Sequence, residues 1–379
     1  MIAGVPKEVG KGERRVALVP ESIARLKGLG IVIERGAGEG AGFPDSGYVE
    51  SGASTASDAK ALYQQAEIIL KVQPPTEGEV GLFREGSTII SFLYPLSNIP
   101  AVKALASRGV TAFAMDLMPR ISRAQSMDAL SSQATVAGYK AVMLAADALP
   151  KLFPLLMTAA GTIAPARVFV LGAGVAGLQA IATARRLGAL VEAYDVRPAV
   201  KEQVESIGAR FVEVPLEVKD AQTAGGYAKA QSDEFYRRQQ ELLAEHTGAA
   251  DVVITTALVP GKRAPLLISE DSVKRMRPGS VIVDLAAEQG GNCALTEPGK
   301  SVVKYGVTIL GPTNVPSSMA PEASQLYSRN ITTFLGNMLK DGKLNLDMND
   351  ELVRGPMVVH EGKVVHDQTR AAMEGASAA

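Results

Sequence analysis

A glycine-rich turn carries the clearest chemical signal in this chain. The segment Gly172-Ala173-Gly174-Val175-Ala176-Gly177 follows an apolar run and opens a helical pattern at Val175–Leu187. In a strand–turn–helix unit, the first glycine permits the tight turn, the second lets backbone approach a pyrophosphate, and the third allows close helix–strand packing. The helix N-terminus adds N–H groups and a positive dipole end. We therefore expect a dinucleotide here, bound by Gly172, Ala173, Gly174, Val175 and Gly177; a similar turn without nucleotide is the competing interpretation.

An acidic residue ends the next predicted strand. Asp195 lies 23 residues after Gly172, close to the spacing expected of a ribose-binding acid. Its carboxylate would accept hydrogen bonds from the 2′-hydroxyl of NAD and repel a 2′-phosphate, which favours NAD over NADP. Arg197 leaves the other cofactor open, because a nearby arginine can accommodate that phosphate.

The distribution of histidine bears on the reaction. The three histidines are His246, His360 and His366, so the first 245 residues contain none. Histidine is the commonest general acid–base residue. Oxidation of an alcohol or amine must move a proton as well as a hydride, whereas hydride exchange between two nicotinamide rings needs no base. The distribution favours the second reaction, although Lys, Tyr or Glu can replace histidine in the first.

A polar segment offers candidate side chains for a nucleotide. It reads Met118-Pro119-Arg120-Ile121-Ser122-Arg123-Ala124-Gln125-Ser126-Met127-Asp128. Either arginine could bind phosphate or a carboxamide oxygen through its donor fork. Gln125 and Asp128 are three residues apart and share one face if the segment is helical. A polar loop ending in a helix cap is the equally weighted alternative.

Three further features allow two interpretations each. In Thr223-Ala224-Gly225-Gly226-Tyr227, glycine hinges could carry the tyrosine as a lid over a cofactor, or the stretch is an ordinary surface loop. Asp284 ends a strand, where a ligand or a turn cap would be equally at home. Cys293 has no nearby histidine in sequence, so a structural role is favoured over a nucleophilic one.

The elements that must position these residues form two alternating blocks. In the first, β-rich runs alternate with helical patterns, which implies a mostly parallel sheet covered on both faces. Its predicted strands are Ile2–Val5, Ile31–Glu34, Ile68–Val72, Thr88–Phe92 and Thr111–Ala114, and its predicted helices are Pro20–Leu29 and Ser57–Gln65. The second block has six strands, which matches a dinucleotide-binding sheet. They are Arg167–Leu171, Leu190–Tyr194, Arg210–Val214, Asp251–Thr255, Ser280–Asp284 and Val307–Leu310.

Two long helical patterns connect the blocks. Asp128–Leu149 leads from the first to the second, and Ala320–Leu339 leads back, followed by a small hairpin and a frayed end at Ala371–Ala379. The fold class is therefore α/β, with two Rossmann-like doubly wound domains joined by long helices, the first discontinuous. We expect residues 1–128 and 320–379 in the N-terminal domain, 138–316 in the NAD(H)-binding domain, and linkers at 129–137 and 317–319.

Composition excludes several classes of protein. The chain has 379 residues, with 39 Lys and Arg against 40 Asp and Glu, so no basic surplus favours nucleic acid. A single cysteine excludes an internal disulfide and a cysteine-based metal cluster, and fits a reducing compartment. The first residues lack the pattern of a signal peptide, and the uncharged stretch Val168–Ala184 is short for a membrane span. We expect a soluble chain without a metal.

Several motifs together resemble a known family. The opening segments 4–8 and 14–20 are similar to the alanine dehydrogenase and transhydrogenase α-subunit superfamily. Other segments resemble, more specifically, the NAD(H)-binding component of proton-translocating nicotinamide nucleotide transhydrogenase. They are Met118–Asp128, Ser131-Ser132-Gln133, Ala137-Gly138-Tyr139, Thr158–Thr162, Lys201–Ser206, Thr223–Tyr227, Thr255–Lys262 and Thr313–Pro316. The resemblance covers roughly residues 1–370.

This resemblance implies roles for residues of both blocks. Arg120, Gln125 and Asp128 match the loop that holds the nicotinamide, with Ile121, Ser122 and Arg123 in the same loop and Ser131 in support. Asp195, Val196 and Arg197 would hold the adenosine ribose. Tyr227 would tip a mobile loop, with Gly226, Gln239 and Leu258 near the cofactor. The residues implied in catalysis are Arg120, Gln125, Asp128, Ser131 and Tyr227.

The resemblance also implies partners and a location. The family component is a homodimer, and it passes hydride from NADH to NADP+ held by a separate NADP(H)-binding domain of the β subunit. Membrane-spanning subunits couple that step to proton translocation, so the chain would lie in the cytoplasm, attached peripherally to the inner membrane. Two alternatives remain: an alanine-dehydrogenase-like enzyme that binds its substrate through Arg15 and Lys71, and a non-catalytic NAD(H)-binding module.

Overall fold

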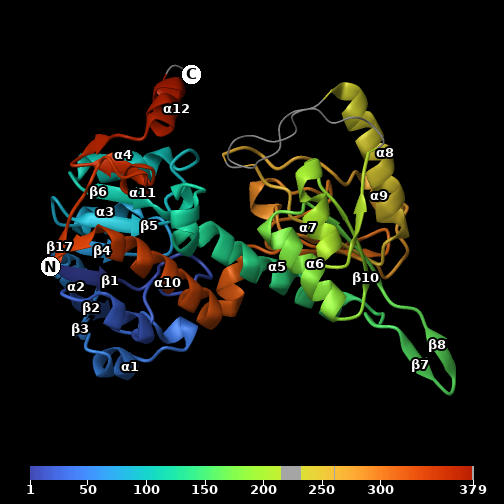
Figure 1. The fold of residues 1–379 in the computed structure, drawn as a ribbon, viewed down its shortest axis with the longest axis horizontal. Coiled ribbons are helices and arrows are strands. Elements are labelled where there is room, and N and C mark those ends of the chain that lie inside the picture. Colours follow the sequence, from blue (N-terminus) through green and yellow to red (C-terminus); the bar gives the residue numbers. More distant parts are fainter. Residues whose placement is uncertain (215–231, 260, 378–379) are drawn as a thin grey trace. The chain divides into compact units, whose positions relative to one another are not determined.

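The computed structural model describes residues 1–214, 232–259 and 261–377. The chain divides into two compact units (Figure 1). Unit 1 comprises Met1–Gln133 and Pro316–Ala379, and unit 2 comprises Ala134–Val315. Unit 1 is therefore built from two separate stretches of sequence, as expected for the discontinuous first domain.

Unit 2 is a doubly wound α/β sheet. Its seven strands lie in the order β11-β10-β9-β12-β13-β15-β14, and every pairing except β14–β15 is parallel. The strands are β9 (Arg167–Leu171), β10 (Leu190–Tyr194), β11 (Arg210–Val212), β12 (Val252–Thr255), β13 (Val281–Asp284), β14 (Ser301–Lys304) and β15 (Val307–Leu310). Because β10 and β12 flank β9, the strand order reverses between β9 and β12, where α/β sheets bind ligands.

Helices cover both faces of this sheet. They are α6 (Val175–Arg186), α7 (Lys201–Ser206), α8 (Asp233–Ala249) and α9 (Glu270–Lys274), with the second half of α5 (Ala129–Ala148). Strand β9 shows why its sequence is continuously apolar: Val168 and Val170 belong to one hydrophobic cluster, and Phe169 and Leu171 to another. A strand buried on both faces has no solvent side on which polar residues would alternate.

A two-stranded hairpin stands out from the rest of unit 2 (Figure 1). It consists of β7 (Leu156–Thr158) and β8 (Gly161–Ile163). All six of its strand residues are exposed, among them Leu156, Met157 and Ile163. Short strands with apolar, outward-facing side chains were not predicted, because no alternation of polar and apolar residues marks them.

Unit 1 contains an eight-stranded sheet in the order β19-β18-β6-β5-β4-β1-β2-β3. The strands are β1 (Ile2–Val5), β2 (Gly30–Glu34), β3 (Ser54–Ala56), β4 (Ile68–Leu70), β5 (Thr88–Ser91), β6 (Thr111–Ala114), β18 (Met357–His360) and β19 (Lys363–Val364). The first six pair in parallel, and the last two add an antiparallel edge. A small separate hairpin is formed by β16 (Leu339–Lys340) and β17 (Lys343–Leu344).

The helices of unit 1 come from both stretches of the chain. They are α1 (Asp45–Glu50), α2 (Ala59–Gln65), α3 (Glu77–Leu82), α4 (Ile99–Ser107), α10 (Ala320–Met338), α11 (Glu351–Arg354) and α12 (Asp367–Ser377). Tyr327 and Phe334 of α10 share one hydrophobic cluster with Ile68 and Leu70 of β4. The returning helix thus completes the core of a sheet that the N-terminal stretch begins.

Most predicted elements are present, with differences at their ends. The strands predicted at Ile2–Val5, Thr111–Ala114, Arg167–Leu171, Leu190–Tyr194 and Val307–Leu310 have the observed bounds. The predicted helix Pro20–Leu29 is instead a short 3-10 helix, Pro20–Arg25. The prediction of a frayed end at Ala371–Ala379 was wrong, since α12 continues to Ser377. Its small residues, Ala and Gly included, masked a helix that begins earlier, at Asp367.

Candidate dinucleotide site

The glycine turn joins β9 to α6 at the reversal of strand order. Gly172 has φ +97°, a left-handed conformation that glycine adopts without a steric cost. A Cβ on Gly177 would lie 1.8 Å from the carbonyl oxygen of Gly172, so only glycine lets the helix pack this closely. A Cβ on Gly174, in contrast, would meet no atom within 4 Å. The three glycines therefore have separate reasons to be present, and of the three only Gly174 faces open space.

The N-terminus of α6 is available to an anion. Gly174 is its N-cap residue, and within the described chain no side chain caps the helix there. Val175, the first helical residue, is 42% exposed. N–H groups in the first turn of a helix have no intrahelical partners. A phosphate at this position would thus meet a positive dipole end and backbone donors.

Two residues outside the motif fix its shape. Thr256, just after β12, donates its hydroxyl to the carbonyl of Gly172 at 3.0 Å. Gly138 of α5 lies against the motif from another side, because a Cβ there would come within 2.1 Å of the carbonyl oxygen of Ala176. Sequence reasoning named neither as a member of the site. Their only local signals were a threonine at a strand end and a glycine inside a helix.

Asp195 lies at the end of β10 and is already well partnered. Its carboxylate accepts the backbone N–H of Ala173 at 2.8 Å, which ties it to the glycine turn. It also accepts Nε and Nη2 of Arg197 at 2.8 and 2.7 Å. These hydrogen bonds are the largest influence that raises the pKa of Arg197. The acid and the arginine, which the sequence left as competing signals, form one ion pair beside the glycine turn.

Asp284 serves as a hub of backbone structure. It is fully buried and accepts hydrogen bonds from the hydroxyls of Thr255 and Thr296 and from the N–H groups of Ala286, Asn292 and Cys293. Five donors on one buried carboxylate favour the cap-like interpretation of this residue over a ligand-binding one. Burial raises the pKa of the Cys293 thiol to about 11, which favours the structural interpretation of that residue as well.

Asn292 transmits this order to the segment after β12. Its side-chain amide exchanges two hydrogen bonds with the backbone of Ala257, at 3.1 and 2.9 Å, and donates to the carbonyl of Pro265 at 2.8 Å. Ala257 in turn lies beside Gly172, since a Cβ on Gly172 would be 3.2 Å from the backbone nitrogen of Ala257. Leu258, next in the chain, is 37% exposed. Buried hydrogen bonds therefore hold the strand end that faces the glycine turn.

The remaining predicted residues of unit 2 are only partly described. Gln239 of α8 is buried and donates to the hydroxyl of Tyr194 at 2.8 Å, which places it next to β10. Gly226 and Tyr227, with the rest of the loop 223–227, lie outside the described residues. Val196 lies between the two members of the ion pair and packs against the hydrophobic cluster that contains Phe169.

The polar segment of unit 1 forms a 3-10 helix, Ser122–Met127, that leads into α5. Arg120, Ser122, Arg123 and Gln125 are exposed, and Ile121 is half-buried. Arg123 forms an ion pair with Asp350 at 2.7 Å. The segment thus presents its long polar side chains outward, which is compatible with both a ligand-binding loop and a polar surface.

Asp128 caps α5. Its carboxylate accepts the N–H of Ser131 at 2.9 Å and the hydroxyl of Ser131 at 2.6 Å. Such a cap satisfies donors of the first helical turn. The helix cap that the sequence left as an alternative is therefore present, and any contact of Asp128 with a nucleotide would be made by a carboxylate that already orders α5.

Asn330 of α10 tethers the same segment. Its amide donates to the carbonyl of Ser126 at 2.9 Å, and its oxygen accepts the hydroxyl of Ser132 at 2.7 Å. Asn330 is 6% exposed, so both bonds are shielded from water. Sequence reasoning missed this residue because it lies 198 positions after Ser132 in the chain.

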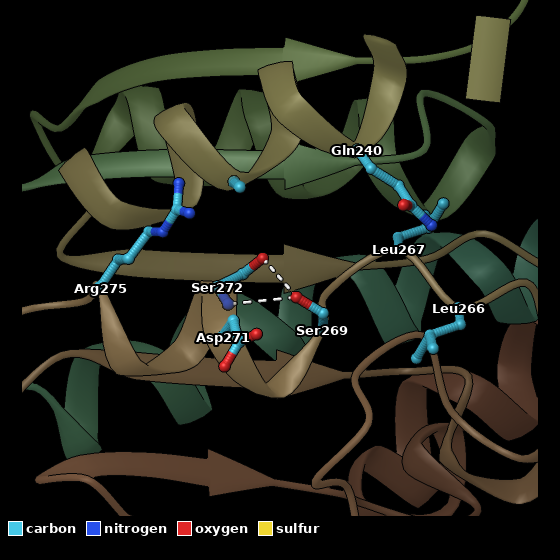
Figure 2. Close-up of a pocket in the computed structure, with 8 residues that line it drawn as sticks. Gln240, Leu266, Leu267, Ser269, Asp271, Ser272 and Arg275 are labelled. Carbon is cyan, nitrogen blue, oxygen red and sulfur yellow. Dashed lines mark hydrogen bonds between the residues drawn. The ribbon is translucent and has the colours of Figure 1, made fainter. Parts of the chain in front are cut away.

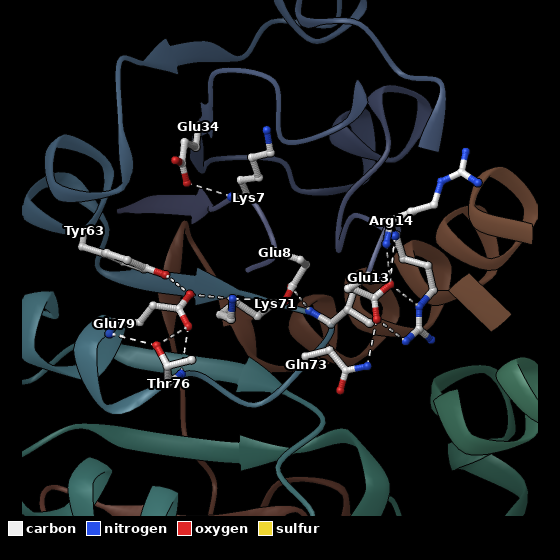
Figure 3. Close-up of polar contacts among 12 residues, drawn as sticks. Lys7, Glu8, Glu13, Arg14, Glu34, Tyr63, Lys71, Gln73, Thr76 and Glu79 are labelled. Carbon is white, nitrogen blue, oxygen red and sulfur yellow. Dashed lines mark hydrogen bonds and ion pairs between the residues drawn. The ribbon is translucent and has the colours of Figure 1, made fainter. Parts of the chain in front are cut away.

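Arg15 and Lys71 belong to a buried cluster of charges in unit 1 (Figure 3). Arg15 forms a bidentate pair with Glu13, at 2.8 and 2.6 Å, and donates to Gln133 at 2.8 Å. Lys71 is completely buried, with Nζ 2.7 Å from Glu79 and 3.1 Å from Glu8. Internal carboxylates thus occupy both cations that the alanine-dehydrogenase alternative assigned to substrate.

The charges of this cluster shift one another's pKa values. Burial would raise the pKa of Glu79, but the Lys71 ammonium and several hydrogen bonds hold it below its ordinary value. Burial prevails at Glu8 and raises the pKa of that carboxyl in spite of the same ammonium. Burial opposes the charge of Lys71, but the two carboxylates outweigh burial and raise the pKa of the ammonium. Lys71 is therefore a paired structural cation.

A small hollow lies between α8 and α9 (Figure 2). Its lining includes Ser269 and Ser272, whose hydroxyls are 3.0 Å apart. Ser269 also accepts the N–H of Ser272, which makes it the N-cap of α9. The hollow contains none of the predicted cofactor residues, and these two hydroxyls are engaged in capping, so it does not compete with the glycine turn as a dinucleotide site.

Two other kinds of site are absent from the described residues. No group of three or more His, Cys, Asp or Glu side chains there is arranged to hold a metal ion. No helix of the described ranges combines the length and apolar character that a membrane crossing requires.

Comparison with known proteins decides the family. The model of the "Alanine dehydrogenase/PNT, N-terminal domain" matches residues 4–137, and that of the C-terminal domain matches residues 141–367. The chain belongs to the alanine dehydrogenase/PNT family. The resemblance noted in the sequence is thereby confirmed, together with the α/β fold class.

Individual relatives narrow the comparison. The chain is 52% identical to an NAD(P) transhydrogenase subunit alpha protein of Rhodospirillum rubrum over 376 residues, 97% of this chain and 98% of the relative. It is 31% identical to alanine dehydrogenase of Bacillus subtilis, over 88% of this chain and 84% of that one. A crystal structure of transhydrogenase from Sinorhizobium meliloti superposes with a TM-score of 0.87 and 46% identity, and the match covers 96% of this chain and all of that one.

Proposed function

We propose that this chain is the NAD(H)-binding subunit of a proton-translocating NAD(P) transhydrogenase. In this proposal, hydride passes directly from NADH on this chain to NADP+ held by an NADP(H)-binding domain of the β subunit. Membrane-spanning subunits couple the transfer to proton translocation, and the chain attaches through them to the cytoplasmic face of the inner membrane. The chain is active only with these partners.

The observation that carries the proposal is the glycine turn in a chain of this family. Gly172 adopts the left-handed turn, Gly177 allows the close packing of α6, and Gly174 leaves its surface open. Asp195 stands at the next strand end, hydrogen-bonded to that turn. This is the arrangement that a dinucleotide pyrophosphate and its ribose require. NAD(H), once bound, would supply the hydride that the reaction transfers.

The roles of the chain's own residues follow from this site. Backbone N–H groups at the start of α6 would bind the pyrophosphate, Asp195 the ribose, and Leu258 would provide an apolar contact at the strand end. Arg120, Gln125, Asp128 and Ser131 are assigned to the nicotinamide, as the family resemblance implies. Direct hydride transfer needs orientation and exclusion of water, and no acid or base from the protein.

We further propose that the subunit is a homodimer and that its β7–β8 hairpin contributes to the interface. Met157 is 74% exposed, and Leu155, Leu156 and Ile163 are exposed by 53%, 40% and 45%. Clustered apolar side chains on a projecting element are typical of a surface that another chain covers. A second copy of the chain is the simplest such partner, and sedimentation velocity at increasing concentration tests it.

No observation favours the alanine-dehydrogenase alternative. Lys71 is fully buried between Glu8 and Glu79, and Arg15 is 4% exposed in its pair with Glu13. A substrate carboxylate would have to displace buried internal carboxylates, which leaves unpaired charges at a large cost.

An isotope experiment tests the proposed reaction. The chain is mixed with an NADP(H)-binding partner domain, NADP+, and NADH labelled at the transferable C4 hydrogen. We expect the label in NADPH, with no dilution by hydrogen from water. A parallel incubation with pyruvate, ammonia and labelled NADH should leave alanine unlabelled. Label in alanine would show a dehydrogenase, and no transfer within a demonstrated complex would show a non-catalytic module.

A further inference from the structure

The end of β10 contains a closed ion pair next to the glycine turn. Arg197 directs Nε, Nη2 and its backbone N–H onto Asp195, at 2.8, 2.7 and 2.9 Å. The side chains of Asp195 and Arg197 are 7% and 16% exposed. Asp195 is also bonded to the N–H of Ala173. The arginine is therefore held within reach of the first residues of the nucleotide turn.

The bound carboxylate resembles a phosphate in the geometry of its acceptors. A planar guanidinium binds carboxylate and phosphate oxygens through the same two-pronged set of donors. In a dinucleotide site of this kind, the strand-end acid faces the ribose 2′-hydroxyl, and the 2′-phosphate of NADP(H) would project from the same atom. Asp195 would thus act twice against NADP(H): it repels the phosphate, and it occupies the donors of Arg197.

We propose that Arg197 is a latent ligand for a 2′-phosphate, kept from NADP(H) by its ion pair with Asp195. The inference rests on the proposed function, because it requires a dinucleotide at the glycine turn. It turns the two conflicting sequence signals into one device for selectivity. Such a device has a purpose in a complex in which the neighbouring domain must hold NADP(H) while this subunit holds only NAD(H).

Binding titrations of the full chain test the inference without a partner. The variants Asp195→Asn and Asp195→Ser remove the charge, and asparagine keeps an oxygen that can accept the N–H of Ala173. Binding is followed by the fluorescence of NADH and of NADPH, with circular dichroism to verify folding. We expect NADPH to bind at least about tenfold more tightly to the variants than to the wild type, and NADH to bind more weakly. The gain should shrink as salt is added, because it comes from charge.

Two further variants assign the gain to Arg197. The double variant D195N/R197A should lose the increase in NADPH affinity. The matched control is Glu192→Gln, which removes a carboxylate from the same strand, where it pairs with Arg210 and His246. The control should gain no NADPH affinity, because the carboxylate it removes does not hold Arg197.

The outcomes separate this inference from the proposed function. If folded Asp195→Asn and Asp195→Ser proteins gain no NADPH affinity while the wild type binds NADH, the latent-ligand inference is overturned and the proposed function stands. A gain that persists in D195N/R197A, or that appears equally in Glu192→Gln, overturns it too. Failure of the wild type to bind NADH would overturn the proposed function itself.

Discussion

Replacement of Glu13 by glutamine should destabilise unit 1 in a pH-dependent way. The carboxylate accepts Nε and Nη2 of Arg15, the backbone N–H groups of Arg15 and Arg14, and Nε2 of Gln73, all within 3.1 Å (Figure 3). Burial would raise the pKa of Glu13, but Arg15 and the other donors together lower it from 4.5 to about 2. The folded state therefore prefers the ionised carboxylate.

The size and sign of the effect follow from this pKa. The unfolded state binds the proton more tightly, so the stabilisation is fully present above pH 4.5 and is lost as the pH falls towards 2. The shift corresponds to about 3 kcal/mol of unfolding free energy at pH 7, of which about 1 kcal/mol remains at pH 3. Glu13→Gln should lose that contribution, and its difference from the wild type should shrink in acid.

Urea unfolding at pH 7 and pH 3 measures this difference. Hydrogen exchange of the β1 and β4 amides would assign the change to unit 1. The matched control is Glu297→Gln, which removes an exposed carboxylate paired with Lys300 and should leave the urea midpoint unchanged. The reasoning would be refuted by an equal loss at both pH values, or by no loss at pH 7.

Further expectations concern nucleotide binding and hydride transfer. Gly174→Ala should fold normally and weaken NADH binding about tenfold in a fluorescence titration, because its methyl group would lie where the pyrophosphate approaches; unchanged affinity would exclude that contact. Gly177→Ala should lower the melting temperature, since its Cβ would clash with a carbonyl at 1.8 Å. Asn330→Ala, which frees Ser126, should slow single-turnover hydride transfer about tenfold at constant NADH affinity. Arg120→Ala should also slow transfer with a modest change in affinity; an unaltered rate would assign it a structural role.

Local patterns in the sequence were sufficient for the fold class and for the glycine turn. Strands such as Arg167–Leu171 are continuous apolar runs, which is what burial on both faces of a parallel sheet requires. The spacing from Gly172 to Asp195 follows from one strand–helix–strand unit. Short elements without such patterns, such as the β7–β8 hairpin and β3, were missed, because three residues carry too little periodicity to identify a strand.

The pairing of charges was decided only by the tertiary structure. The sequence shows that Lys71 and Arg15 are cations, but not that Glu8, Glu13 and Glu79 neutralise them inside unit 1. It shows Asp195 and Arg197 side by side as opposite arguments about the cofactor, whereas the folded chain joins them in one ion pair. Composition fixes how many charges a chain has. Which of them remain available to a ligand depends on neighbours that folding brings together and on the water that burial removes.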